Sequence, residues 1–289
     1  RRQIREPAMH FGLTIFPTEY SISMIDLARA AEERGFESLW VSEHTHIPVS
    51  RRSPWPGGPE LPKMYYDTLD PFVALASAAS ATSRIKLATG ICLIVERDPI
   101  HTAKLVASVD QVSGGRFMLG IGGGWNLEEM ENHGTNPESR FKLLRERIEA
   151  MKAIWTQDEA EYHGDLVDFD PIFMWPKPVQ EPHPPIHVGG GFPGGARRAI
   201  RYGDGWMPIG GRDGNIAERL PQFHEMAREA GRDPQTLEIS IVGAEPKSDA
   251  LARHRDAGIS RAVLGLPPAP RDEILPILDT YAGLMESVS

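Results

Sequence analysis

Short apolar runs alternate with longer amphipathic segments along most of the chain. The first pair is a strand-like run at 10–16 and a helical spacing of apolar residues that ends at Gly35. Later strand-like runs are continuously rich in Val, Ile and Leu, as parallel strands buried on both faces require. The further predicted strands are 37–42, 85–95, 116–121, 186–188, 206–209, 237–242 and 261–266, and the further predicted helices are 71–81, 99–112, 127–133, 137–155, 196–202, 216–230 and 272–285.

The alternation is interrupted once, between 159 and 185. This stretch contains five prolines and several aromatic residues, which predicts a hairpin and an extended excursion inserted before the fifth strand. Eight strands alternating with at least eight helices favour an α/β fold of the (β/α)8 TIM-barrel type over an open doubly wound sheet. Residues 1–8 are polar and aperiodic, so we interpret them as an N-terminal extension, with Met9 as the natural start and 9–289 as one barrel domain.

The net charge and the cysteine content of the chain argue against several classes of function. A net charge of −9 argues against nucleic-acid or anionic-membrane surfaces, because phosphate binding needs a positive field. No apolar run approaches the roughly 18 residues of a membrane helix. The chain has one cysteine, Cys92, which excludes an intrachain disulfide and fits a reducing cytoplasm. We therefore expect a cytoplasmic protein that acts on a small-molecule substrate.

In a TIM barrel the active site lies at the C-terminal ends of the strands. The loop after the second predicted strand contains His44 and His46, which as an i, i+2 pair are candidate zinc ligands. Strands 206–209 and 261–266 offer no partner ligand at their ends, so we predict no metal. A histidine at the barrel mouth otherwise transfers a proton or hydrogen-bonds a loop, and its position alone favours neither role.

The stretch 189–194 follows a strand, precedes a helix and fits G-x-G-x-x-G, the form of a dinucleotide-binding turn. A Rossmann turn also needs a strand-end acid about twenty residues further on, and Asp213 lies instead in a loop. The more general interpretation is a phosphate site, because glycines let backbone N–H groups approach an anion at a helix N-terminus. Arg197, Arg198 and Arg201 follow and suit either a polyanionic tail or a solvated helix face.

Several longer motifs occur in a fixed order along the chain. They are Ala31–Phe36 leading to Trp40–His44, Ile85–Ile91, Asp110–Phe117 running to Gly120–Trp125, Trp175–Gln180, Pro185–Gly190 and Gly203–Trp206. In these motifs the chain resembles the luciferase-like monooxygenases and the deazaflavin (coenzyme F420)-dependent oxidoreductases. Among subgroups it is most similar to the mycobacterial and actinobacterial deazaflavin-dependent oxidoreductases.

The resemblance implies a bacterial luciferase-like barrel with an insertion, assembled as a homodimer or higher oligomer. It also implies a non-prolyl cis peptide after the third strand, which forms a bulge behind the coenzyme ring. It assigns proton transfer or coenzyme hydrogen bonding to His44, with Glu43 orienting it. The residues that would hold the coenzyme are Gly90 and Ile91 at the cis bond, Gly122, Gly123 and Gly124, the phosphate-binding Gly189, Gly190 and Gly191, and Arg197.

One position departs from the family pattern. Sugar-phosphate dehydrogenases of this family carry a catalytic glutamate just after the fourth strand, where this chain has Trp125. We therefore expect Trp125, Asn126 and Trp175 to shape a pocket for an apolar or flat substrate, with aromatic walls also from Trp55, Tyr65 and Tyr66.

The sequence predicts an oxidoreductase that transfers a hydride between coenzyme F420 and a small organic substrate. One alternative is a two-component monooxygenase that uses reduced FMN and oxygen, and another is a non-catalytic flavin-binding protein. FMN has no long acidic tail, so Arg197 and Arg198 favour the deazaflavin.

Overall fold

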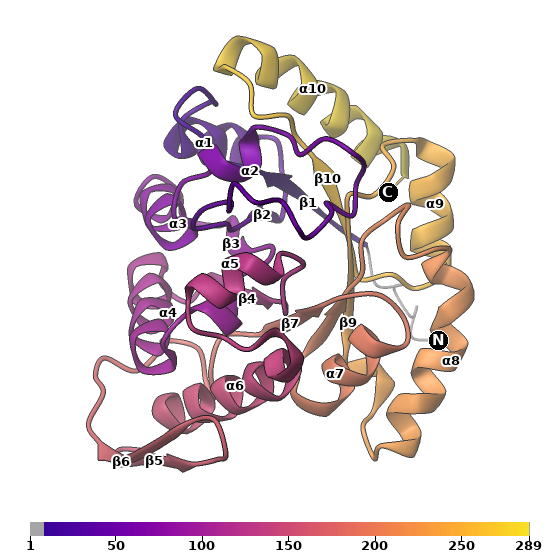
Figure 1. The fold of residues 1–289 in the computed structure, drawn as a ribbon. Coiled ribbons are helices and arrows are strands. Elements are labelled where there is room, and N and C mark those ends of the chain that lie inside the picture. The colour runs from indigo at the N-terminus through magenta and orange to yellow at the C-terminus, as the bar shows by residue number, and fades with distance from the viewer. Residues whose placement is uncertain (1–8, 289) are drawn as a thin grey trace.

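Eight parallel strands form a closed barrel in the computed structural model, which describes residues 9–288 (Figure 1). Around the barrel the order is β1-β10-β9-β8-β7-β4-β3-β2, with β1 paired to both β10 and β2. The predicted (β/α)8 barrel is confirmed. The barrel strands are β1 (His10–Ile15), β2 (Ser38–Val41), β3 (Lys86–Thr89), β4 (Phe117–Ile121), β7 (Ile186–Gly189), β8 (Gly205–Met207), β9 (Glu238–Val242) and β10 (Arg261–Gly265).

Helices surround the barrel on its outside (Figure 1). The α-helices are α1 (Met24–Glu33), α2 (Met64–Asp67), α3 (Pro71–Ser80), α4 (Pro99–Ser113), α5 (Leu127–Asn132), α6 (Arg140–Thr156), α7 (Gly194–Tyr202), α8 (Ile216–Glu229), α9 (Ser248–Asp256) and α10 (Arg271–Val288), and the 3-10 helices are η1 (Ile94–Glu96), η2 (Pro137–Ser139) and η3 (Pro234–Thr236). Successive residues of a strand belong to two different apolar clusters. Leu39 and Leu87 belong to the large cluster that also contains helix residues, whereas their neighbours Trp40 and Ala88 belong to a smaller cluster. Within residues 9–288, no helix is long and apolar enough to cross a membrane.

The structure differs from the prediction at the third strand and at one further helix. The third strand was expected to run to residue 95, but β3 ends at Thr89, and the apolar residues beyond it form an irregular segment and η1. Helix α9 was not predicted at all; only Ala250 and Leu251 of its nine residues are buried, which leaves little apolar periodicity. The predicted extension 1–8 lies outside the described residues.

The predicted insertion is a hairpin, β5 (Ala160–His163) and β6 (Asp168–Ile172), that projects beside α6 (Figure 1). The Glu146 side chain of α6 accepts a hydrogen bond from the backbone N–H of Leu166 at 2.7 Å. The proline-rich return is held by Asp110, which is fully buried and accepts bonds from the backbone N–H groups of Val179 (2.7 Å) and Gln180 (3.0 Å). The insertion is therefore fastened at the turn of its hairpin and at its proline-rich return.

A buried cation closes the N-terminal end of the barrel. Arg261 is fully buried; its Nε and Nη2 donate to Glu37 at 2.8 and 2.9 Å, and its Nη1 donates to Glu238 at 2.9 Å. Burial by itself would raise the pKa of Glu37, but the hydrogen bonds and charge of Arg261 outweigh it and lower the pKa to about 2. The ion pair therefore links folding stability to pH.

We expect Glu37→Gln to lower the free energy of unfolding at pH 7 by about 3 kcal/mol. Because the folded-state pKa of Glu37 lies below the unfolded-state value, its stabilisation is complete above the ordinary carboxyl pKa and is lost as the pH falls towards 2. Urea denaturation between pH 7 and pH 3 should therefore show the wild type and the variant converging in acid. Glu60→Gln, at an exposed loop position, is the matched control, and an equal difference at both pH values would contradict the prediction.

Candidate active site

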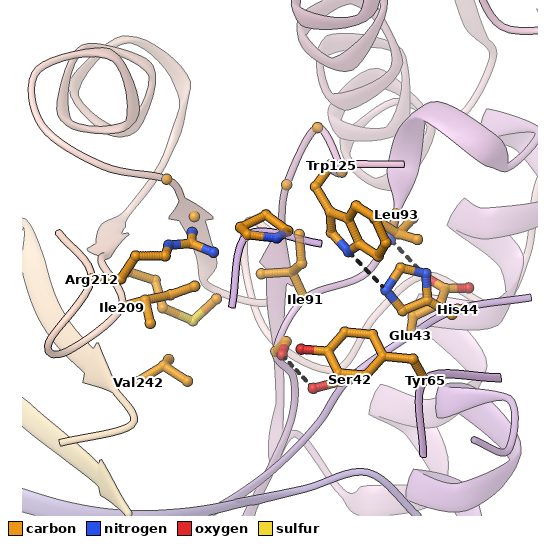
Figure 2. A pocket seen from close by; sticks show the side chains of 18 of the residues that line it. Ser42, Glu43, His44, Tyr65, Ile91, Leu93, Trp125, Ile209, Arg212 and Val242 are labelled. Atoms are coloured by element: carbon orange, nitrogen blue, oxygen red, sulfur yellow. Dashed lines mark hydrogen bonds between the residues drawn. The ribbon is translucent and has the colours of Figure 1, made fainter. Parts of the chain in front are cut away.

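A cavity of about 250 Å³ opens at the C-terminal ends of the barrel strands. Figure 2 shows His44, Tyr65 and Trp125 on one side of it and Ile209, Arg212 and Val242 on the other. The residues that line it are Phe16, Ser42, Glu43, His44, Trp55, Pro56, Tyr65, Gly90, Ile91, Leu93, Gly122, Gly123, Gly124, Trp125, Phe141, Gly189, Gly190, Arg198, Met207, Ile209, Arg212 and Val242. The predicted site residues thus largely meet in one place.

The segment after β3 lies at the base of this cavity. The Gly90–Ile91 peptide bond is cis, as the family resemblance implied. The Ser42 hydroxyl donates to the Gly90 carbonyl at 3.0 Å (Figure 2), and the Cys92 N–H donates to the Gly120 carbonyl at 2.7 Å. The neighbouring strand ends β2 and β4 therefore fix the segment on both sides.

Two glycines leave room for the Ile91 side chain. A Cβ atom at Gly122 would lie 1.9 Å from Ile91 Cδ1, and one at Gly189 would lie 3.2 Å from Ile91 Cγ2. Any side chain at Gly122 would therefore push Ile91 out of its place. Glycine at position 122 therefore lets Ile91 keep its side-chain conformation at the bottom of the cavity.

The ring of His44 is held at both nitrogens. Nδ1 lies 2.6 Å from Oε2 of Glu129, and the indole Nε1 of Trp125 donates to Nε2 at 3.3 Å (Figure 2). An indole N–H only donates, so Nε2 carries the lone pair and the proton resides on Nδ1, directed at Glu129. The carboxylate is fully buried and the His44 side chain is 6% exposed. This arrangement places a proton acceptor, Nε2, beside the cavity.

Glu43 does not orient His44, and that expectation was wrong. Its Oε2 accepts from the backbone N–H of Leu93 at 2.7 Å, and its Oε1 accepts from Arg97 Nε at 2.6 Å. Arg97 also donates to Asp70 at 2.7 Å. Glu43 thus anchors the segment that follows the cis peptide and lies away from the ring nitrogens of His44.

Glu129, the actual partner of His44, was missed in the sequence. Asn126 and Glu129 are spaced as an N-cap and N3 pair, a pattern that predicts a capping box. Half of that pattern holds, since the Asn126 side chain accepts from the Glu129 N–H at 3.2 Å. The Glu129 carboxylate instead turns to His44 and to the Thr45 N–H, at 3.0 Å. The capping pattern next to a strand end is the only sequence signal for Glu129. Capping of the following helix explains that pattern equally well, so the pattern does not identify Glu129 as a partner of His44.

Aromatic rings surround His44. The ring centroid of Tyr65 is 5.3 Å from that of His44 and 5.5 Å from that of Trp55. The expected walls from Trp55, Tyr65 and Trp125 are present.

Three other residues expected at the substrate pocket lie outside the cavity lining. Asn126 is 3% exposed and caps α5. Tyr66 is 53% exposed. Trp175, 55% exposed, lies in the proline-rich return, where its carbonyl accepts a hydrogen bond from Lys104 on α4. The substrate-pocket prediction is therefore wrong for Asn126 and Trp175, because one serves a helix and the other packs outside the barrel.

The glycine loop after β7 leads into α7. Gly190 has φ 116°, a conformation open to glycine, and its carbonyl accepts from Trp206 Nε1 at 2.8 Å. The N-cap of α7, Pro193, offers no side-chain hydrogen bond to the first turn. Gly191 lies just behind the lining, beside Asp213.

A basic groove adjoins the cavity, and Phe141 and Arg198 line both. Arg197 lies in the groove and not in the cavity. The cationic side chains that line this basic groove are Lys142, Arg145, Arg197, Arg198 and Arg201. The Nε atom of Arg198 is buried and has no hydrogen-bond partner among the described residues. The groove therefore continues the cavity with a concentration of positive charge.

His46 is directed away from the cavity, with Nδ1 2.8 Å from Thr45 Oγ1 and Nε2 2.9 Å from Asn132 Nδ2. The two histidines at i and i+2 thus do not converge. No group of three or more His, Cys, Asp or Glu side chains with metal-ligand geometry occurs in the described part of the chain.

Comparison with known proteins agrees with this geometry. Residues 14–262 match the family model described as luciferase-like monooxygenase, and the chain belongs to this family. The uncharacterized protein Rv0953c of Mycobacterium tuberculosis is 41% identical over 280 residues, covering 95% of this chain and 98% of that protein. The F420-dependent hydroxymycolic acid dehydrogenase of the same organism is 33% identical over 232 residues, covering 78% of this chain and 60% of that protein.

Solved structures share the fold. The monooxygenase RslO1 from Streptomyces bottropensis has a TM-score of 0.75 at 22% identity and covers 95% of this chain and 98% of that one. An F420-dependent secondary alcohol dehydrogenase in complex with an F420-acetone adduct has a TM-score of 0.74 at 22% identity and covers 97% and 99%. These structures support the barrel fold, and a relative named as F420-dependent is similar to this chain in sequence.

We expect Glu43→Gln to destabilise the protein by about 3–5 kcal/mol, because it leaves the largely buried Arg97 without its main counter-charge. Thermal unfolding followed by circular dichroism measures the effect. Glu286→Gln, at an exposed position of α10, controls for the loss of one negative charge. Equal melting temperatures for Glu43→Gln and the wild type would show that the anchor contributes nothing.

Proposed function

We propose that this protein is an F420-dependent oxidoreductase that transfers a hydride between the deazaflavin and a small organic substrate such as an alcohol or its carbonyl product. The observation that carries the proposal is the continuity of the cavity with the basic groove. A coenzyme with a flat ring and a long acidic tail needs both parts, whereas FMN needs only a ring site and one phosphate site. Relatives named as F420-dependent support the same choice.

The residues present fit such a coenzyme. The base formed by Gly90, Ile91 and Gly122 offers a flat apolar surface, and a Cβ at Gly122 would disturb it. The loop Gly189–Gly191 and the uncapped start of α7 offer backbone N–H groups to a phosphate. Arg198, with its buried unpartnered Nε, lies between the loop and the basic groove, where an anion would complete its hydrogen bonding.

When bound, the deazaflavin would supply the ring carbon that accepts or gives the hydride. His44 handles the accompanying proton: a substrate hydroxyl displaces the Trp125 indole N–H from Nε2, whose lone pair then accepts the hydroxyl proton during oxidation and returns it during reduction. Glu129 holds the ring in the required tautomer and stabilises the imidazolium that forms. Trp55, Tyr65 and Trp125 exclude water and favour a flat or apolar substrate. The proposal includes a cytoplasmic location and a homo-oligomeric assembly.

The coenzyme choice is tested by titrating the protein separately with oxidised F420 and with FMN, following tryptophan fluorescence. We expect tight binding of F420 alone. Tight binding of FMN alone would replace the proposal by the oxygen-dependent monooxygenase, and binding of neither would refute both assignments.

Charge reversal in the basic groove should weaken F420 binding selectively. We expect Arg197→Glu to raise the Kd for F420 about twofold to fivefold, with the loss shrinking at high salt, because an exposed charge contact contributes about 1 kcal/mol or less. Arg253→Glu, on exposed α9, controls for net charge. An unchanged Kd would exclude the basic groove as the tail site.

Proton transfer is tested with His44→Ala. We expect the rate of F420 reduction by a panel of secondary alcohols to fall about 10²–10⁴-fold, while the Kd for F420 stays within about twofold. The decrease in deazaflavin absorbance measures the rate. Unchanged turnover with any alcohol that the wild type oxidises would remove His44 from the mechanism.

A further inference from the structure

Behind His44, on the side away from the cavity, hydrogen-bonding side chains continue to the protein surface. Glu129 contacts His44 Nδ1 at 2.6 Å and approaches Thr45 Oγ1 at 3.4 Å. The same hydroxyl lies 2.7 Å from Nε2 of His133 and 2.8 Å from Nδ1 of His46. The His133 side chain is 29% exposed. A continuous set of groups that can give and accept protons therefore connects the buried base with solvent.

A second buried carboxyl group lies beside this line. The Glu96 side chain is 1% exposed, and its Oε2 has no hydrogen-bond partner among residues 9–288. Its Oε2 lies 3.9 Å from His133 Nε2, and the Glu129 carboxyl is near enough for the two negative charges to interact. Two carboxyl groups this near to each other at a buried site cannot both be ionised without a large cost. Sharing one proton removes the repulsion and provides the missing donor.

The charges around Glu96 come from several elements. Glu129 and His133 face it from α5 and its C-terminal end, Glu43 from the loop after β2, and Arg97 from the end of η1 itself. From α6, Arg147 donates to the Ile94 carbonyl at the start of η1.

Burial, reinforced by the negative charges of Glu129 and Glu43, raises the pKa of Glu96 to about 9, and Arg97 offsets only part of this. Burial and the neighbouring His46 lower the pKa of His133. At neutral pH the carboxyl pair thus holds a proton, while the histidine nearest the surface is neutral and free to accept one.

We propose that Glu96 and Glu129 share one proton and, through Thr45 and His133, pass protons between His44 and solvent. This inference rests on the proposed function only for the direction of transfer. In this proposal Glu96 and His133 are positioning and proton-transfer residues that act through His44, because neither of them lines the cavity.

The proton count is balanced at each step. During alcohol oxidation the substrate carbon gives its hydride to the coenzyme, and the hydroxyl proton goes to His44 Nε2. His44 then releases its Nδ1 proton to the Glu129–Glu96 pair. The pair, now holding one proton too many, gives one to His133 by way of the Thr45 hydroxyl, and His133 loses it to water. Oxidation leaves His44 with its proton on Nε2; reduction runs the same sequence backwards and restores the proton on Nδ1. Neither direction requires the filled cavity to admit solvent.

The shared proton is tested without coenzyme or substrate. Infrared spectra of the protein should contain the C=O stretch of a buried carboxylic acid at pH 7 that shifts in D₂O and disappears as the pH is raised beyond about 9. We expect Glu96→Gln to abolish this band. Glu128→Gln is the matched control, because the neighbouring Glu128 bonds Ser53, which together with other hydrogen bonds outweighs its burial and lowers its pKa to about 2. Absence of the band in the wild type, or its persistence in Glu96→Gln, would overturn the proposal.

The pathway is tested by Thr45→Val, which keeps the side-chain shape and removes the hydroxyl. In stopped-flow experiments with a pH-indicator dye, the wild type should release its proton together with F420 reduction. We expect Thr45→Val to retain the first hydride transfer within about threefold but to delay proton release at least about tenfold, and added imidazole to shorten that delay. Synchronous release in the variant would overturn the pathway. A protein that fails to bind F420 would refute the proposed function, while the infrared result would still decide whether the carboxyl pair shares a proton.

Discussion

Buried carboxyl groups constrain the arrangement of the loops after β2, β3 and β4, which form one side of the cavity. A carboxylate removed from water must be matched by donors or a counter-charge, and the loops are folded so that Glu43 and Glu129 each obtain them. Glu43 accepts hydrogen bonds from the Leu93 N–H and from Arg97, which fixes the chain after the cis peptide. Glu129 accepts hydrogen bonds from the Thr45 N–H and from Nδ1 of His44. The position of the segment that lines the bottom of the cavity and the orientation of the His44 ring thus follow from the same physical requirement.

The strand and helix order could be predicted because buried parallel strands and amphipathic helices leave strong periodic signals. The signal failed where burial is slight or backbone geometry is irregular. Helix α9 buries two of its residues, and β3 ends early although apolar residues continue to Val95, because these pack in a non-strand conformation. Apolar character reports burial, and it does not report the backbone conformation in which a residue is buried.

The site could be predicted in outline from the chain order of strand ends, which brought His44, Gly122 and Gly189 together. Its pairings could not. Whether His44 meets Glu43 or Glu129 depends on how α5 folds back across the barrel mouth, and no local pattern encodes that contact. Trp175 is a residue that a family motif suggested for the site but that lies outside it. It lies on the outside of the barrel, where the proline-rich return packs against α4.

The fastening of the insertion has a consequence for how this barrel can vary. Asp110 and Glu146 bind backbone N–H groups of the proline-rich return and of the hairpin turn, and backbone contacts are indifferent to side-chain identity. Exposed side chains of this turn such as Leu166 can therefore change, whereas the length of the turn is fixed because the Leu166 and Val167 N–H groups bond Glu146. The excursion is an outer surface whose exposed side chains can vary while its backbone path is held.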